Sequence, residues 1–126
     1  MNSIIGEKSL AFAKRIAKCY RFLRDKKKET VMSKQLLRCG TSIGANVREG
    51  QYAQSKKDFI SKMNIALKEA GETDYWLDVI HAADYFTDEE YTSLDSDNKE
   101  LVKMLSAIVK TAKESLKKDE EKRKDK

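Results

Sequence analysis

The feature of this sequence that most constrains its fold is a four–three spacing of apolar and small residues that recurs along the chain. The segments that carry this spacing are residues 5–23, 36–53, 59–80 and 91–112. Such a period is typical of an α-helix with one buried face. No segment alternates apolar and polar residues like a strand, and proline, which interrupts helices, does not occur in the chain. The sequence therefore predicts an all-α protein.

Short polar connections separate the four segments, and two of them carry signals for the start of a helix. The sequences SKKD from Ser55 and TDEE from Thr87 match the capping box, in which a hydroxyl and a carboxylate bind each other's free backbone amides. At the start of the second segment, we expect the side-chain oxygen of Thr30 or Ser33 to cap the helix. A spacing near 3.5 residues with short connections predicts an antiparallel up-down-up-down four-helix bundle.

The 126-residue length is that of a single domain. We assign residues 1–117 to the bundle and residues 118–126 to a charged C-terminal tail that continues the last helix and then frays. The sequence shows neither a signal peptide nor an apolar run near the roughly 20 residues of a membrane span. We therefore expect a cytoplasmic protein without membrane association, in which Cys19 and Cys39 are buried, reduced thiols.

The second segment contains the stretch RCGTSIGANVREG, which fits two motifs. From Gly40 to Gly44 it matches both the G-x-S-x-G nucleophile elbow and the G-x-x-x-G spacing of closely packed helices. An elbow serine at Ser42 would need a preceding strand and a histidine partner, but the preceding residues are helical and the chain has one histidine, His81. A phosphate-binding loop would need a following G-K-[ST]. We interpret Gly40, Gly44 and Ala45 as close-packing residues, and this face as one candidate for a subunit contact.

The carboxylates of the second and third segments raise the question of a metal site. Di-iron bundles use inward glutamates and two E-x-x-H pairs, which one histidine cannot supply. We therefore expect no metal, no cofactor, no small-molecule substrate and no catalysis; stoichiometric iron or manganese would contradict this. We predict instead that a set of polar residues forms hydrogen bonds at a helix–helix or subunit contact. These residues are Arg38, Ser42, Asn46, Glu49, Glu69 and Glu72.

The net charge of +5 is unevenly distributed along the chain. It is +7 in residues 1–35, −8 in residues 61–100 and +4 in residues 101–126. On the first helix the basic residues lie away from the apolar stripe, as expected of a surface that binds phosphates. The residues predicted to contact nucleic acid are Lys14, Arg15, Lys18, Arg21, Arg24, Lys26, Lys27 and Lys28. Tyr75 and Trp76 are predicted to be core residues rather than platforms for bases.

Two stretches, QLLRCGTSIGANVREG and DFISKMNIALKEAGETDYWL, resemble the characteristic segments of a known family. This family comprises the four-helix-bundle proteins encoded in intervening sequences of bacterial 23S ribosomal RNA genes, also described as S23 ribosomal protein-like. The residues that match the patterns S-I-x-A-N-x-x-E and E-x-x-E-x-x-Y-W are Ser42, Asn46, Glu49, Glu69, Glu72, Tyr75 and Trp76. The resemblance implies a homopentamer without catalysis. Accessory variability determinants of retroelements are similar in fold and bind RNA through a basic surface, which implies RNA association.

The leading hypothesis is a non-enzymatic homo-oligomer that contacts RNA through the basic surface of its first helix and its C-terminal segment. The alternative is a protein–protein interaction module, or scaffold, that binds no nucleic acid and whose charge serves solubility.

Overall fold

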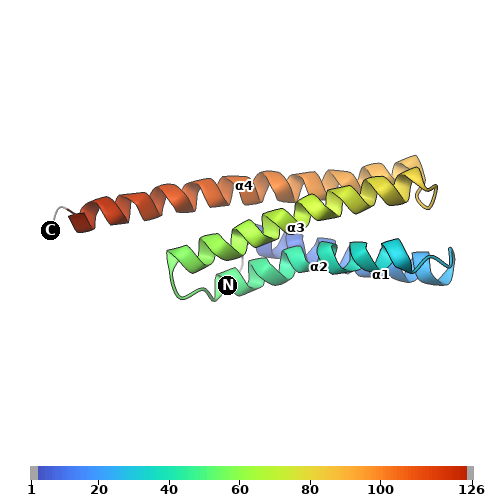
Figure 1. Ribbon diagram of the computed structural model, residues 1–126, viewed down its shortest axis with the longest axis horizontal. Helices are drawn as coiled ribbons and strands as arrows, with labels where there is room; N and C mark the ends of the chain where they lie inside the picture. The colour runs from blue at the N-terminus through green and yellow to red at the C-terminus, as the bar shows by residue number, and fades with distance from the viewer. Residues whose placement is uncertain (1–2, 125–126) are drawn as a thin grey trace.

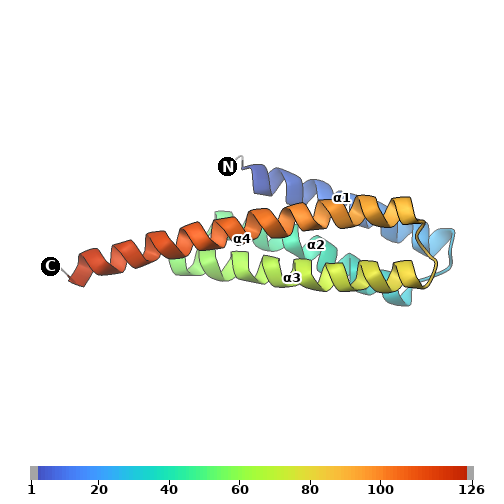
Figure 2. The same ribbon diagram turned by 90° about the horizontal axis from the view of Figure 1, so that it is seen from above.

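The computed structural model describes residues 3–124 of the protein, and all of its regular structure in this range is helical. The helices are α1 (Ile4–Asp25), α2 (Val31–Gln51), α3 (Lys56–Ala82) and α4 (Asp88–Lys124). Each helix packs against the next in the chain, and α4 closes the bundle against α1. The connections α1–α2 and α3–α4 lie at one end, and the α2–α3 connection lies at the other end with both termini (Figures 1 and 2). The predicted four-helix bundle is confirmed.

The core consists of the four apolar stripes, one from each helix. Ile16, Leu36, Leu77 and Leu105 are at most 1% exposed and belong to one continuous cluster. In α2 the buried stripe runs through Val47, whereas Asn46 beside it is only half-buried. The stripe ends at Gly50, because α2 ends at Gln51 and does not reach residue 53 as predicted. Leu36, Ile43, Val47 and Gly50 step by seven, four and three, so Val47 keeps the helical period of the buried face.

Both predicted capping signals act at helix starts. The Ser55 hydroxyl accepts a hydrogen bond from the Asp58 amide over 3.1 Å at the start of α3. Before α4 the box is reciprocal: the Glu90 amide donates to the Thr87 hydroxyl (3.1 Å), and the Thr87 amide donates to the Glu90 carboxylate (2.8 Å). Each bond satisfies a backbone donor that has no partner inside its helix.

The prediction for the cap of α2 is wrong, because Glu29 performs this role instead of Thr30 or Ser33. One Glu29 oxygen accepts from the amides of Val31 (3.0 Å) and Met32 (2.9 Å), and the other accepts from the Ser33 amide (2.8 Å). Thr30 makes no side-chain cap bond, and the Ser33 hydroxyl donates to the Glu29 carbonyl. Burial alone would raise the pKa of Glu29, but these donors outweigh burial and lower it. A carboxylate serves well here because its charge also complements the helix dipole.

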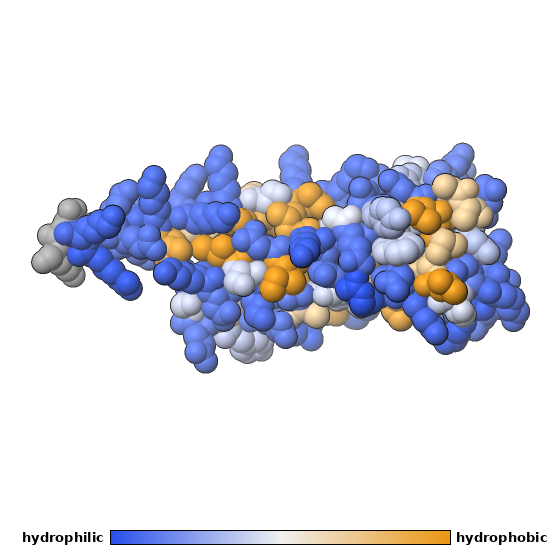
Figure 3. All heavy atoms as spheres, in the orientation of Figure 1, coloured by the Kyte–Doolittle hydropathy of each residue, from blue (hydrophilic) through white to orange (hydrophobic). Residues whose placement is uncertain are grey.

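The C-terminal charged segment continues α4 as far as Lys124, and this end of the helix projects beyond the other three (Figures 1 and 2). The Lys56 ammonium, at the start of α3, contacts the Ser115 hydroxyl (2.7 Å) and the Asp119 carboxylate (2.5 Å). On the face shown in Figure 3, the projecting end is hydrophilic. The separate tail over residues 118–126 stays a prediction, and residues 125–126 lie outside the described range. Within residues 3–124, no helix is long and apolar enough to cross a membrane.

Candidate functional site

The small residues of α2 lie against α1 of the same chain. A Cβ atom at Gly44 would be 3.1 Å from the Ser9 carbonyl oxygen, and one at Gly40 would be 3.0 Å from the side chain of Ile16. The backbones of α1 and α2 therefore approach closely at Gly44, and the Ile16 side chain fills the space beside Gly40. The small-residue face of α2 was one candidate for a subunit contact. In the structure α1 packs over Gly40 and Gly44 on this face, whereas Ala45 is exposed beside a hollow between the two helices.

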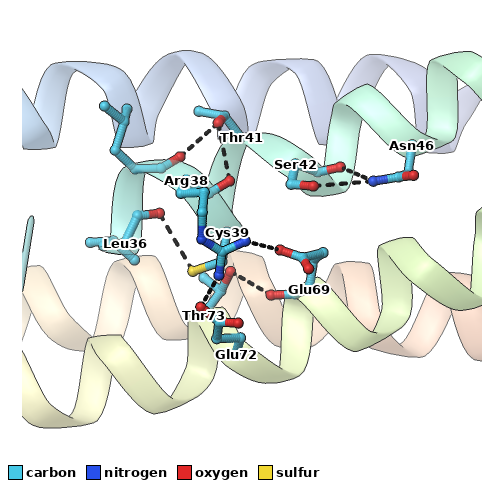
Figure 4. A network of polar contacts seen from close by, with 10 residues as sticks. Leu36, Arg38, Cys39, Thr41, Ser42, Asn46, Glu69, Glu72 and Thr73 are labelled. Carbon is cyan, nitrogen blue, oxygen red and sulfur yellow. Dashed lines mark hydrogen bonds and ion pairs between the residues drawn. The ribbon is translucent and has the colours of Figure 1, made fainter. Parts of the chain in front are cut away.

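Ser42 is half-buried on α2, and its hydroxyl is bonded within the same helix. The Asn46 side-chain amide donates to the Ser42 hydroxyl (3.1 Å) and to the Ser42 carbonyl (2.9 Å), as Figure 4 shows. His81 is near the end of α3, where its Nε2 atom is 2.7 Å from the Asp88 carboxylate and its ring stacks on Tyr91 at 4.2 Å between centroids. These contacts fit the interpretation of Ser42 as a helix residue rather than a nucleophile.

Arg38 joins α2 to α3. Its guanidinium forms ion pairs with Glu69 (3.1 Å) and with Glu72 (Figure 4). The side chain of Glu69 is 16% exposed, and that of Arg38 is 52% exposed. Exposure of this degree makes the network a modest contributor to stability. Both ion pairs join α2 to α3 of the same chain.

Glu49 is separate from that network. Its carboxylate is 3.4 Å from the Lys62 ammonium on α3, and its side chain is 62% exposed. Glu49 thus faces α3 across the α2–α3 seam and lies apart from the ion pairs of Arg38.

The two thiols are free, Cys39 in the core and Cys19 half-buried. Burial raises the pKa of both, and that of Cys19 reaches about 11. Thiols with raised pKa values are weak nucleophiles at neutral pH. Across residues 3–124, no group of three or more His, Cys, Asp and Glu side chains is arranged to hold a metal ion.

The predicted nucleic-acid residues divide into two groups. Two arginines form ion pairs with other residues of the chain. Arg15 binds Asp97 (2.8 Å) and the Ser93 hydroxyl (2.6 Å) on α4, and Arg24 binds Asp25 (2.7 Å). The others are exposed and form no ion pair with any residue between 3 and 124. These exposed cations, here called the α1 basic surface, are Lys14, Lys18, Arg21, Lys26, Lys27 and Lys28.

A shallow hollow of about 260 Å³ lies within this surface, and an aromatic ring lines it. The lining residues are Lys18, Arg21, Phe22, Asp25 and Lys26. Phe22 is 40% exposed, and the Lys27 ammonium is 5.9 Å from its ring centroid. The sequence-based prediction missed Phe22, although an aromatic residue beside Arg21 and just outside the buried stripe was a usable signal.

The prediction that Tyr75 is a core residue is wrong. It is 58% exposed, while Trp76 is half-buried and packs against the core. The buried stripe of α3 runs through Thr73, Leu77 and Ile80, so Tyr75 is two residues away from a buried position and points outward.

Lysines also line one face of α4 from Lys103 towards its C-terminal end, here called the α4 basic surface. Its members are Lys103, Lys110, Lys113 and Lys117, all exposed and all without an ion pair to another described residue. They step by seven, three and four, so they share one side of the helix. The N-terminal half of the same helix is acidic, with Asp95, Asp97 and Glu100.

Comparison with known proteins supplies the family. The family model described as "23S rRNA-intervening sequence protein" matches residues 1–107. The chain belongs to this family. A solved structure of a protein with unknown function from the S23 ribosomal protein family, from Bacteroides thetaiotaomicron, is 54% identical with a TM-score of 0.84. The alignment covers 85% of this chain and 99% of that chain. No curated protein matches.

The α1 basic surface of this 23S rRNA-intervening sequence protein lies wholly inside the matched residues. Three of the four lysines of the α4 basic surface lie beyond residue 107. The first surface therefore belongs to the shared bundle, and most of the second is carried by the C-terminal extension of α4.

Proposed function

We propose that the protein is a non-enzymatic, homo-oligomeric bundle that binds RNA through the α1 basic surface. The observation that carries the proposal is the set of exposed, unpaired cations on α1 and the α1–α2 connection. Membership of a family described by its link to 23S rRNA genes supports RNA as the polyanion. A role on such transcripts would place the protein in the cytoplasm.

Counterion release gives the proposal a quantitative form. Each neutralised phosphate of a single strand contributes about −0.7 to the slope of log affinity against log salt concentration. Six contacts, one for each cation of the α1 basic surface, predict a slope of roughly −4. Binding should therefore be strong at low salt and weaken steeply as salt is added.

The test compares two triple variants that carry equal changes of charge. The first reverses Lys18, Arg21 and Lys26 to glutamate on the α1 basic surface. The matched control reverses Lys34, Lys57 and Lys68, exposed lysines of α2 and α3 that form no ion pair with a described residue. We expect the first variant to lose more RNA affinity and more salt dependence than the control. No detectable RNA affinity of the wild type at about 50 mM salt would overturn the proposal. A pull-down with one stoichiometric protein and no nucleic acid would favour an interaction module instead.

The oligomer is a separate part of the proposal. By similarity to the family, we propose a homopentamer. A ring of this kind needs two different complementary patches on each subunit, and the acidic and basic halves of α4 are of suitable opposite charge. Light scattering should give the mass of a pentamer, and a monomeric mass at micromolar concentration would refute this part while leaving RNA binding open to its own test.

A further inference from the structure

The hollow at the C-terminal end of α1 brings an aromatic ring together with three cations. We propose that it is a subsite for one base of single-stranded RNA, in which the base stacks on Phe22 and the flanking phosphates contact Lys18, Arg21 and Lys26. This inference rests on the proposed RNA binding and adds the class of RNA and the position of one nucleotide.

The side chain of Phe22 is not needed to fill the core. Its neighbour Leu23 and the preceding stripe residue Ile16 are both 0% exposed and fill the interior at this level of α1. Phe22 instead keeps 40% of its surface accessible among charged side chains. An apolar ring held in a basic surface has the features of a stacking platform in single-strand binding proteins, where aromatic faces take bases and cations follow the backbone.

The charges around the ring favour an electron-rich, anionic ligand. Lys18, Arg21 and Lys26 line the hollow, and Lys27 lies over the ring of Phe22. Asp25 is the one carboxylate among the lining residues, and the Arg24 guanidinium binds it at 2.7 Å. That hydrogen bond, together with the nearby charges of Arg21 and Lys28, keeps the pKa of Asp25 below its usual value although desolvation opposes it. Three lining cations against one carboxylate leave the hollow with a net positive charge for phosphate.

The aromatic ring of Phe22 also favours single-stranded over duplex RNA as the ligand. In a duplex both faces of each base are covered by its neighbours, so an aromatic side chain can stack only on a base that is unpaired or splayed out. Phenylalanine has no polar atom with which to read a base edge, so the subsite would accept any base. The structure thus favours an unpaired, sequence-tolerant ligand over a helical one.

The first experiment measures affinity with Phe22→Ala. The probes are an unstructured RNA of about 12 nucleotides, a duplex of the same length, and heparin, a polyanion without bases. Loss of a stacking aromatic should weaken single-strand binding roughly 5- to 150-fold and leave heparin binding unchanged. Tyr75→Ala, which removes another exposed aromatic ring, is the matched control and should bind like the wild type.

The second experiment places a reporter at the site. In the variant Phe22→Trp, Trp76→Phe, the one tryptophan should be quenched by the single strand and unaffected by heparin. If both ligands bind but neither changes the emission, or if Phe22→Ala binds the single strand like the wild type, the inference is overturned while the proposed function stands. If the wild type binds neither RNA probe, both fall.

Discussion

Gly44 and Gly71 offer a direct measurement of how closely α1 and α2 approach. Both are glycines inside helices, so replacement by alanine should contribute about 1 kcal/mol of helix propensity at each site. Around Gly71 a Cβ atom would meet nothing within 4 Å, and Gly71→Ala should therefore stabilise the protein by about that amount. It serves as the reference for the crowded site.

At Gly44 the new atom would be 3.1 Å from the Ser9 carbonyl oxygen and 3.3 Å from its carbonyl carbon. Backbone atoms cannot rotate out of the way, so α1 as a whole must shift. Overpacking of this kind costs about 1–3 kcal/mol, which offsets or exceeds the gain in propensity. Gly44→Ala should thus be less stable than Gly71→Ala by about 1–3 kcal/mol, or roughly 4–12 °C in melting temperature for a chain of this size.

Urea unfolding followed by circular dichroism measures this difference. Both variants must be compared at one protein concentration, because assembly would add to apparent stability. Gly40→Ala should also be less stable than Gly71→Ala, because its Cβ would be 3.0 Å from both Cγ atoms of Ile16, a fully buried β-branched side chain. If Gly44→Ala is as stable as Gly71→Ala, the close approach of the helices described above is incorrect.

Three further predictions concern polar contacts. Glu29→Gln should cost about 1 kcal/mol of stability at neutral pH through loss of the charged cap. Because the pKa of Glu29 is lowered, the stabilisation by its carboxylate is present above a pH of about 4.3 and is lost as the pH falls. The stabilities of wild type and variant, measured by urea unfolding, should therefore converge in acid. The hydrogen bond from Tyr91 to Asp78 raises the pKa of Tyr91 to about 12. The resulting stabilisation is present below about pH 10 and is lost as pH rises towards 12. The wild type should therefore lose stability over this pH range, whereas Tyr91→Phe should not. Tyrosinate absorbance follows the ionisation of Tyr91 directly, and ionisation of every tyrosine near pH 10 would contradict the hydrogen bond. A double-mutant cycle of Arg38→Ala and Glu72→Gln should give a coupling of about 0.2–1 kcal/mol that shrinks in high salt.

The helices and the core were predictable because burial repeats with the helical period and needs no knowledge of neighbours. Ile16 or Leu77 is a core residue in any bundle that this pattern forms. The cap of α2 was not predictable by the same route. Lys28 adopts a positive φ of 58°, and the Glu29 amide donates to the Leu23 carbonyl. This turn places the Glu29 carboxylate over the start of α2, and residue preferences at helix starts do not encode it.

The candidate surface was only partly predictable, for a different reason. The basic face of α1 follows from its period, but which cations remain available depends on the helix beside it. Arg15 is engaged because Ser93 and Asp97 of α4 lie next to it. Local sequence patterns indicate the face of a helix, whereas the neighbours decide what that face can still bind.

The order in which the helices contact each other bears on how the chain folds. Apart from the α1–α4 seam, every helix contact within residues 3–124 joins consecutive helices. Low sequence separation of this kind is associated with fast folding. During synthesis, α1, α2 and α3 can therefore assemble while α4 is still being made. The seam that α4 then closes against α1 includes exposed ion pairs, such as Lys8 with Glu100. Because the start of α1 and the end of α4 lie at the same end of the bundle (Figures 1 and 2), a pull on these two helix ends would load this seam first.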